Sequence, residues 1–381
     1  MIVPAPGPQQ PARPGPAPSP GTPAAASVDG RPRAWIAWET QRRSQNLSRR
    51  LEARLRLCLH EDRGWLRYPL SLAQTVAELW RMRGGLVFVQ NPSQVLAVLA
   101  CLFKKPFGYT LVVDRHSNFP HLWPNPNPLR RAVASALSAF SVKRADITLI
   151  TNGELLRHVE SLGGRGFILP DPFPELGGEA EASVQDPEDA RNAKGRPAEI
   201  LFVSSWACDE PIAQAIEACR LLQGEVVVRI SGRMKPAYAD LVASAPPNFR
   251  PTGFLGDRDY FALMAASDAV MAVTDRQATL VCGAYEAAAL GKPLILGDAP
   301  ALREYFHAGA VYTDCSAEDL AAKIRALLSD LPRYREDARR MRKERESEWE
   351  QRLEALEGLL VGLPGNPHPA RDGAKAPGPG R

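Results

Sequence analysis

Short apolar runs alternate with longer amphipathic stretches along residues 31–174. The runs have the length of buried strands, and in the longer stretches apolar residues recur at helical spacing. Strands are predicted at 34–38, 85–90, 109–114, 147–151 and 166–169, and helices at 45–59, 71–82, 94–103, 129–144 and 154–162. Ser93 is a suitable N-cap for the third of these helices. This alternation indicates βαβ units and a parallel sheet.

A second series of the same kind follows residues 175–197, which are acidic and glycine-rich and contain few large apolar residues. Strands are predicted at 199–203, 225–230, 249–252, 269–273, 293–296 and 310–312, and helices at 211–222, 236–243, 260–266, 281–290 and 317–328. Residues 332–360 form a long, highly charged helical pattern. The predicted fold class is therefore α/β, with two Rossmann-like parallel-sheet domains that face each other across a cleft.

The domain boundaries follow from these changes in pattern. Residues 1–30 and 364–381 are rich in proline, glycine and alanine and are expected to be disordered tails. The predicted parts are tail 1–30, N-terminal domain 31–174, linker 175–197, C-terminal domain 198–330, C-terminal helix 331–363 and tail 364–381.

Charge and composition exclude several classes of function. The 47 basic and 43 acidic residues give a net charge of +4, too balanced for a nucleic-acid partner. No signal peptide and no apolar run long enough to span a membrane are evident, so a cytoplasmic protein is expected. The six cysteines form no Cys-x-x-Cys pair, and no metal site is predicted.

Two groups of polar residues follow strands in the N-terminal domain. Gln90 and Asn91 stand between a strand and a helix start, where side-chain amides and free N–H groups suit an anion or a sugar hydroxyl. Asp114 and His116 follow the next strand, and such a pair can act as a general base with its orienting carboxylate. The alternative interpretations are a plain strand–turn–helix and a capped turn with a structural histidine.

Three groups of candidate residues occur in the C-terminal domain. Ser204 and Ser205 follow a strand, and their hydroxyls and turn amides suit phosphate oxygens. Gly232 permits close backbone approach, and Arg233 can neutralise a diphosphate. Glu286 lies in a helix of small apolar residues, where a carboxylate needs exposure or a partner. The alternatives are a capping role of Asp209 and Glu210 at the helix start that follows the two serines, a surface turn at Gly232 and Arg233, and a solvent-facing Glu286.

Together these segments resemble the GT-B glycosyltransferases, and especially the glycosyltransferase 4-like group. Residues 285–295, with Asp298 and Glu304 after them, are similar to that group's donor signature. The resemblance implies that the N-terminal domain binds the acceptor and the C-terminal domain binds a nucleotide-sugar donor. It implies that Glu286 binds the ribose, that the amides around Thr279 and Leu280 approach the diphosphate or the sugar, and that Phe254 lies beside the base. Ser204 and Ser205 would lie in the first loop of the donor domain, and Arg233 and Lys292 would neutralise the charge of the diphosphate.

Two further islands, around Gln90–Ser117 and Ser204–Glu210, resemble the eukaryotic enzymes that add the first β-mannose to dolichol-linked chitobiose. That resemblance places Gln90, Asn91 and Arg115 on the acceptor side, although the family has tryptophan where this chain has Arg115. Retaining members usually carry a second glutamate where this chain has Ala278. Inversion is therefore favoured, with His116 as the base and Asp114 as its orienter or as the base itself, and without metal or other cofactor.

The expected partners are a nucleotide-sugar donor and a glycan or lipid-linked acceptor. A lipid-linked acceptor would require contact with the inner face of a membrane, for which residues 122–144 and 42–59 mix basic and apolar side chains. Two rival functions remain, a nucleotide-sugar 2-epimerase and a catalytically silent GT-B scaffold or partner subunit. An NAD oxidoreductase is disfavoured because no Gly-x-Gly-x-x-Gly follows a strand.

Overall fold

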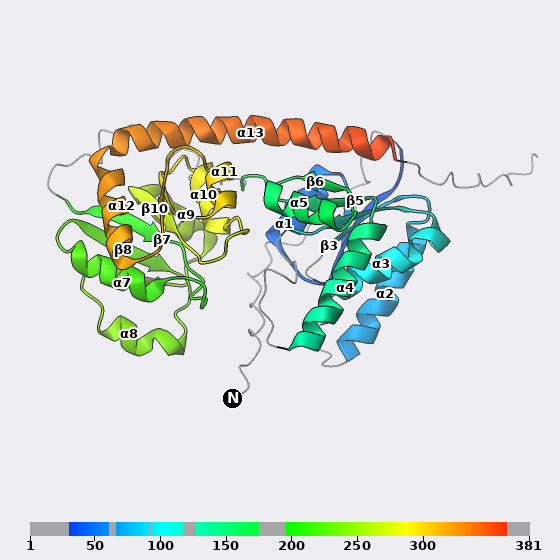
Figure 1. The fold of residues 1–381 in the computed structure, drawn as a ribbon, viewed down its shortest axis with the longest axis horizontal. Helices are drawn as coiled ribbons and strands as arrows, with labels where there is room; N and C mark the ends of the chain where they lie inside the picture. The colour runs from blue at the N-terminus through cyan, green and yellow to red at the C-terminus, as the bar shows by residue number, and fades with distance from the viewer. Residues whose placement is uncertain (1–29, 61–65, 91–92, 117–126, 175–195, 364–381) are drawn as a thin grey trace, which may run out of the picture. The chain divides into compact units, whose positions relative to one another are not determined.

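The computed structural model describes residues 30–60, 66–90, 93–116, 127–174 and 196–363. Asn91, nearly all of both predicted tails and most of the predicted linker lie outside the described residues. The described chain forms two compact units (Figure 1). Unit 1 takes its residues from Met1–Leu149, Val159–Phe167 and Glu357–Arg381, and unit 2 takes its residues from Ile150–His158 and Ile168–Leu356.

Unit 1 is built on a six-stranded sheet of order β2-β1-β3-β4-β5-β6. Its strands are β1 (Arg33–Ala37), β2 (Arg54–Leu57), β3 (Leu86–Gln90), β4 (Thr110–Asp114), β5 (Ile147–Ile150) and β6 (Gly166–Ile168). The pairs from β2 through β5 are all parallel. The predicted parallel sheet is therefore confirmed for this half of the chain.

Three helices cover one face of this sheet side by side (Figure 1): α2 (Arg67–Arg81), α3 (Gln94–Phe107) and α4 (Pro128–Arg144). Their apolar side chains pack on alternate residues of β1, β3 and β4, among them Ile36, Val89 and Val113. The predicted N-cap of α3 is confirmed, because the Ser93 hydroxyl accepts a hydrogen bond from the Leu96 amide. The remaining helices of the N-terminal half are α1 (Arg42–Arg50) and α5 (Gly153–Ser161).

The prediction of one helix over residues 45–59 was wrong. Helix α1 ends at Arg50, and the chain then turns through Glu52, whose φ of 52° is left-handed, into strand β2. The sequence of β2, Arg-Leu-Arg-Leu, alternates with period two, which is the pattern of a strand rather than of a helix. Arginines occur throughout residues 45–59, so the segment was assigned to a single helix and the change of period was missed.

Unit 2 is built on a second six-stranded sheet, of order β12-β11-β10-β7-β8-β9, with every pair parallel. This order corresponds to the 3-2-1-4-5-6 arrangement of doubly wound dinucleotide-binding folds. The strands are β7 (Ala198–Phe202), β8 (Val226–Ser231), β9 (Phe249–Gly253), β10 (Ala269–Ala272), β11 (Leu294–Gly297) and β12 (Ala310–Thr313).

Helices cover both faces of the second sheet. The helices are α7 (Ile212–Leu221), η4 (Pro236–Tyr238), α8 (Ala239–Ala243), α9 (Asp257–Ala266), α10 (Cys282–Ala289), α11 (Pro300–Tyr305), α12 (Ala317–Ser329) and α13 (Leu331–Val361). Helices α7 and α12 pack on one face, and α9, α10 and α11 pack on the other. Only α11 had no counterpart among the predicted helices, and its six residues are too few to show a helical period.

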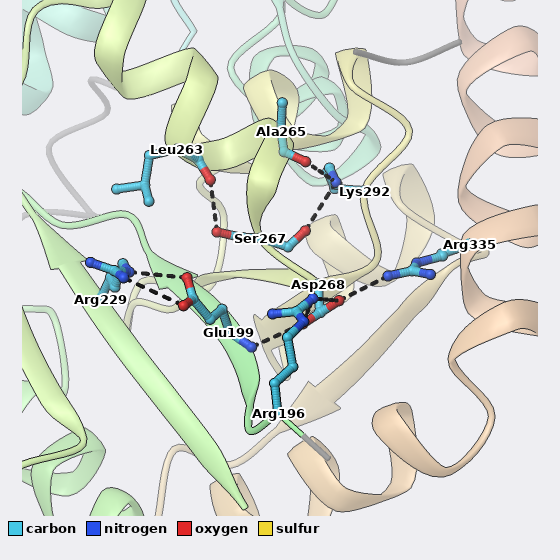
Figure 2. A network of polar contacts seen from close by, with 9 residues as sticks. All are labelled: Arg196, Glu199, Arg229, Leu263, Ala265, Ser267, Asp268, Lys292 and Arg335. Carbon is cyan, nitrogen blue, oxygen red and sulfur yellow. Dashed lines mark hydrogen bonds and ion pairs between the residues drawn. The ribbon is translucent and has the colours of Figure 1, made fainter. Parts of the chain in front are cut away.

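The amino edge of the second sheet is held by a charged network (Figure 2). Asp268, which is buried before β10, accepts hydrogen bonds from the Glu199 amide at 2.9 Å, from Arg335 of α13 at 2.9 Å and from Arg196 at 3.2 Å. Glu199 in turn pairs with Arg229 at 3.1 Å. This edge therefore has a structural role, in which several donors satisfy one buried carboxylate.

Helix α10 lies very close to the second sheet because it consists largely of small residues. A Cβ atom placed on Gly283 would lie 2.6 Å from a methyl carbon of Val203 and 2.8 Å from its Cβ. No helix in the described part of the chain combines the length and apolar character of a membrane span.

We predict that Gly283→Ala lowers the free energy of unfolding by about 1–3 kcal/mol, since the added methyl group overpacks the contact between α10 and β7. Val203→Ala in the same chain should recover part of that loss, because it removes the obstructing methyl groups. Urea unfolding of the two single variants and the double variant measures the coupling. Additive effects of the two substitutions would contradict this account of the close packing.

Candidate functional site

The strand order locates the ligand-binding edge of each sheet. In open parallel sheets, ligands bind at the carboxyl ends of the strands where the order reverses. The order reverses between β1 and β3 in unit 1 and between β7 and β10 in unit 2. The first point adjoins Gln90, and the second is flanked by the loop after β7, with Ser204 and Ser205, and by the loop that leads from β10 to α10.

Asp114, at the end of β4, forms a fully buried ion pair with Arg43 of α1. The Arg43 guanidinium donates from Nε at 3.0 Å and from a terminal nitrogen at 2.8 Å to the same carboxylate oxygen. Burial by itself raises the pKa of Asp114, but the Arg43 charge, with a contribution from His116, outweighs it and lowers the pKa to about 2. Asp114 is therefore ionised at neutral pH and a very weak base, which favours the orienting role over the role of base.

His116 lies next to this ion pair. Its Nδ1 atom is 3.6 Å from Asp114 Oδ2, and its side chain is 20% exposed while that of Asp114 is fully covered. The imidazole therefore reaches the surface at the carboxyl edge, and the carboxylate behind it favours one ring orientation. Of the two side chains, only that of His116 is accessible to solvent.

Arg115 points the opposite way from its neighbours. Successive side chains of an extended chain alternate between the two faces of a sheet, so Asp114 faces α1 and Arg115 faces α4. The Arg115 guanidinium is fully buried and donates to the Ser138 carbonyl and to the Ser141 hydroxyl, both at 3.3 Å. Burial lowers its pKa to about 10. The structure thus gives Arg115 a packing role under α4, and we leave it out of the acceptor-side residues.

Gln90 is in register with Asp114 at the ends of β3 and β4. Its side chain is buried, and neither amide atom has a hydrogen-bond partner among the described residues. A buried amide without partners is costly unless water or a ligand satisfies it. The Gln90 amide can therefore bind a polar ligand or water at this edge of the sheet. Asn91 lies outside the described residues.

In unit 2, the loop after β7 is organised by its own glutamate. The Glu210 carboxylate accepts from the Ser204 hydroxyl at 2.5 Å, from the Ser205 hydroxyl at 2.8 Å and from the Ser205 amide at 3.0 Å. The Ser204 hydroxyl also accepts from the Trp206 amide at 2.9 Å. The two serines thus surround an anionic group, here a side chain of the same loop, which fixes the loop's conformation.

Gly232 packs against this loop. Its φ is +89°, and a Cβ at this position would lie 2.2 Å from the Ser204 carbonyl oxygen. Trp206, also in a left-handed conformation, donates from its indole to the Ser231 carbonyl at 2.9 Å. The close approach at Gly232 is therefore to protein backbone. Arg233, the next residue, is exposed and forms no hydrogen bond or ion pair with the described residues.

The loop after β7 is also tied to the loop after β10. Asp209 pairs with Arg276 at 2.9 Å and accepts from the Thr274 hydroxyl at 2.9 Å. Its carbonyl accepts from the Asp275 amide at 2.9 Å. These contacts cross the point between β7 and β10 where the strand order reverses. They therefore hold the beginning of the segment that leads from β10 to α10 in place.

Glu286 lies one turn into α10 and is half-buried. Its carboxylate accepts a hydrogen bond of 2.6 Å from the hydroxyl of Tyr260, which stands on α9. Thr279 and Leu280, both half-buried, precede the helix, and the N-cap residue Val281 supplies no side-chain cap. The α10 N-terminus therefore combines a positive helix end with a nearby carboxylate, which suits a phosphate and a sugar hydroxyl respectively.

Phe254 and Lys292 are the remaining two predicted donor residues. Phe254, after β9, is exposed. Lys292 precedes β11 at the amino edge of the sheet, where its ammonium group donates to the carbonyls of Ala265 and Ser267 (Figure 2). There it satisfies the last carbonyls of α9, a favourable place for a cation. We therefore leave Lys292 out of the proposed donor site.

Arg43 and Tyr260 are site residues that the sequence analysis missed. Arg43 lies four residues before Leu47 and eight before Leu51, both of which are buried, so it belongs to the apolar stripe of α1. A buried arginine requires an anionic partner, and this spacing was a usable signal. Tyr260 gave no comparable signal, because its contact with Glu286 joins two helices.

We predict that Asp114→Asn lowers the free energy of unfolding by about 3–5 kcal/mol at neutral pH, because it leaves the Arg43 charge buried and unpaired. The folded-state pKa of Asp114 lies below its usual 3.8, so its contribution to stability is present above pH 4 and is lost as pH falls toward 2. Chemical unfolding between pH 7 and pH 2 should therefore show a flatter curve for the variant. The exposed Asp240→Asn serves as control, and identical curves for all three proteins would contradict the pairing.

Comparisons with known proteins agree with the fold. Residues 197–330, from the start of β7 to the end of α12, match the family model of the glycosyl transferases group 1. No curated protein matches the sequence. The finer resemblance to the β-mannosyltransferases finds no support in these matches.

Solved structures of low sequence identity share the architecture. Anabaena HepE in complex with UDP and glucose has a TM-score of 0.63 at 16% identity, covering 87% of this chain and 92% of HepE. Sucrose-phosphate synthase from Thermosynechococcus elongatus has a TM-score of 0.60 at 17% identity, with 78% of each chain covered. A trehalose-6-phosphate synthase studied for glycosyl transfer with retention has a TM-score of 0.58 at 12% identity, covering 78% of this chain and 79% of that one. The chain thus has the two-domain α/β fold of the GT-B type, and its residues 197–330 match a glycosyltransferase family.

Proposed function

We propose that this protein is a glycosyltransferase that moves a sugar from a nucleotide-sugar donor to a hydroxyl group of an acceptor. The observation that carries the proposal is the half-buried Glu286 carboxylate, which accepts a hydrogen bond from the Tyr260 hydroxyl. It lies one turn from the N-terminus of α10, where the N-cap residue makes no side-chain cap hydrogen bond. This arrangement lies inside the segment that matches the glycosyltransferase family. HepE, which shares the fold, was solved with UDP-glucose, UDP and glucose.

The donor is held by unit 2. The Glu286 carboxylate accepts from the ribose hydroxyls, while the start of α10 and the amides around Thr279 and Leu280 receive the diphosphate. Arg233, exposed and without an ion-pair partner among the described residues, adds positive charge. Phe254 offers an exposed ring to the base. These groups stabilise the leaving diphosphate, so the proposed reaction needs no metal and an excess of EDTA should leave the rate unchanged.

The acceptor is activated at the edge of unit 1. His116 removes the proton of the acceptor hydroxyl as that oxygen attacks the anomeric carbon, while the bond to the nucleotide breaks. Asp114, held ionised by Arg43, orients the imidazole and stabilises its protonated form. Gln90 offers its buried amide to a second hydroxyl of the acceptor.

We further propose inversion at the anomeric carbon, since a single direct attack places the base on the acceptor side. The acceptor is a glycan or a lipid-linked precursor, a class to which the resemblance of two islands to β-mannosyltransferases points. The ratio of anomers in the first product, measured by proton NMR, tests the stereochemistry. A product with the donor's configuration would contradict it.

We predict that Glu286→Gln weakens nucleotide-sugar binding about 10- to 100-fold, because a carboxylate binds a hydroxyl more strongly than an amide does. A thermal-shift panel of nucleotide sugars first identifies the donor, and calorimetric titration then measures its affinity. Glu217→Gln, on the exposed surface of α7, is the matched control. Unchanged affinity in Glu286→Gln would refute the donor site, and a panel without any ligand would refute the proposed function.

We predict that His116→Ala lowers kcat about 10²- to 10⁴-fold while donor affinity stays within twofold, because the base acts on the acceptor alone. His307→Ala, which removes a half-exposed histidine of unit 2, controls for loss of an imidazole elsewhere. Turnover with a synthetic acceptor and titration with the donor separate the two effects. A fall in donor affinity with unchanged kcat would contradict the assigned role.

A further inference from the structure

The first turns of α2 and α4 expose apolar side chains that no described part of the chain covers. Leu129 is 72% exposed, Tyr68 53% and Val133 50%, and Leu66 and Leu70 are exposed above 40%. Single exposed apolar residues are ordinary, but five in the opening turns of two helices that flank α3 form a group. We call these five residues the apolar tip.

The position of the apolar tip follows from the topology. The strand pairs from β2 through β5 are parallel, so each helix that connects two of these strands runs back across the sheet and starts at the carboxyl edge. Helices α2 and α4 therefore begin at the edge that carries Gln90 and His116. Figure 1 shows the starts of these two helices at the same end of unit 1.

The early part of α4 differs from an ordinary surface helix. Leu129, Val133 and Ala136 stand at positions i, i+4 and i+7, the spacing of an apolar stripe, yet all three are exposed. The buried residues of the helix, Ser138, Ser141 and Val142, all lie in its second half. The stripe of the first half therefore has no partner among the described residues of unit 1.

The charge of the tip has one sign. Residues 66–70 and 127–136 contain three arginines, Arg67, Arg130 and Arg131, and no acidic residue. The side chains of Arg130 and Arg131 form no hydrogen bond or ion pair with the described residues. Apolar side chains next to arginines such as Arg130 and Arg131 are the composition of a segment that lies at the interface of an anionic bilayer.

The segment of residues 42–59 does not have this character. Leu47 and Leu51 of this segment are buried, and Arg43 is paired with Asp114. Of the two stretches whose sequence suggested membrane contact, only the one that includes α4 presents its apolar side chains outward, and α2 adds a group that the sequence analysis did not include.

We infer that the apolar tip docks on the surface of an anionic lipid bilayer and so brings a lipid-linked acceptor to His116. The lipid-linked acceptor in this inference rests on the proposed function, whereas the docking of the apolar tip on a bilayer does not. Leu129 and Val133 enter the level of the acyl chains, and Arg130 and Arg131 contact lipid phosphates. The acceptor edge of unit 1 then faces the bilayer.

Sedimentation with vesicles tests the docking. The full chain should bind vesicles of phosphatidylcholine with 30% phosphatidylglycerol, about 10-fold or more above binding to pure phosphatidylcholine, and 1 M salt should reduce the difference. The double variant Arg130→Glu/Arg131→Glu should lose at least 10-fold in vesicle binding. The control Lys105→Glu/Lys143→Glu makes the same change of net charge at two exposed lysines near the other ends of α3 and α4, and it should retain most of the binding.

A second variant separates the apolar contribution from the charge. Leu129→Ser/Val133→Ser should also lose vesicle binding, whereas Leu102→Ser, on the exposed side of α3, should not. Equal binding by the tip variants and their controls would overturn the inference. So would self-association of the chain that the tip variants abolish, without any binding to vesicles.

Donor titration separates this inference from the proposed function. Both tip variants should bind the nucleotide sugar as the unaltered chain does and should keep turnover with a short water-soluble acceptor. Vesicle binding by a chain that binds no nucleotide sugar would leave the docking standing and refute the glycosyltransferase. Donor turnover without vesicle binding would support the glycosyltransferase and refute the docking.

Discussion

Parallel strand pairing is the constraint on which the rest of this structure depends. Because strands β2 through β5 of the first sheet and all strands of the second sheet run parallel within their sheets, these strands end at one edge and the helices that connect them begin there. Polar residues that follow strands, such as Gln90, Asp114 and Ser204, are thereby collected at the carboxyl edges. At the amino edge of the second sheet, Asp268 and Lys292 form hydrogen bonds and ion pairs that stabilise the fold.

The carboxylates of Asp114 and Glu286 have different surroundings, which suit them to different roles. Asp114 is fully covered and both of its oxygens accept from the Arg43 guanidinium, so it stays charged and is a very weak base. Glu286 is half-buried and accepts a hydrogen bond from the neutral phenol of Tyr260. The first is suited to orienting an imidazole, and the second to binding sugar hydroxyls.

Preorganisation is visible around the second sheet. Glu210 fills the anion-binding turn formed by Ser204 and Ser205, and Asp209 ties this loop to the one after β10. Gly232 is required by the close approach of the Ser204 carbonyl. These contacts hold the approach to α10 before any ligand arrives, which reduces the ordering that a donor would impose.

The sequence by itself determined the order of most elements, because the periods of strands and helices are local properties of a few successive residues. Strand β2 and the short helix α11 were missed. The sequence also determined that polar groups such as Asp114-Arg115-His116 follow strands, and hence on which edge they gather. Only the tertiary structure decided what each side chain meets. Arg115 faces α4 while Asp114 meets Arg43, and Lys292 caps α9 at the other edge of its sheet. Such partners are set by the packing of helices on sheets, which brings together residues that are distant in the sequence and whose spacing carries no local signal.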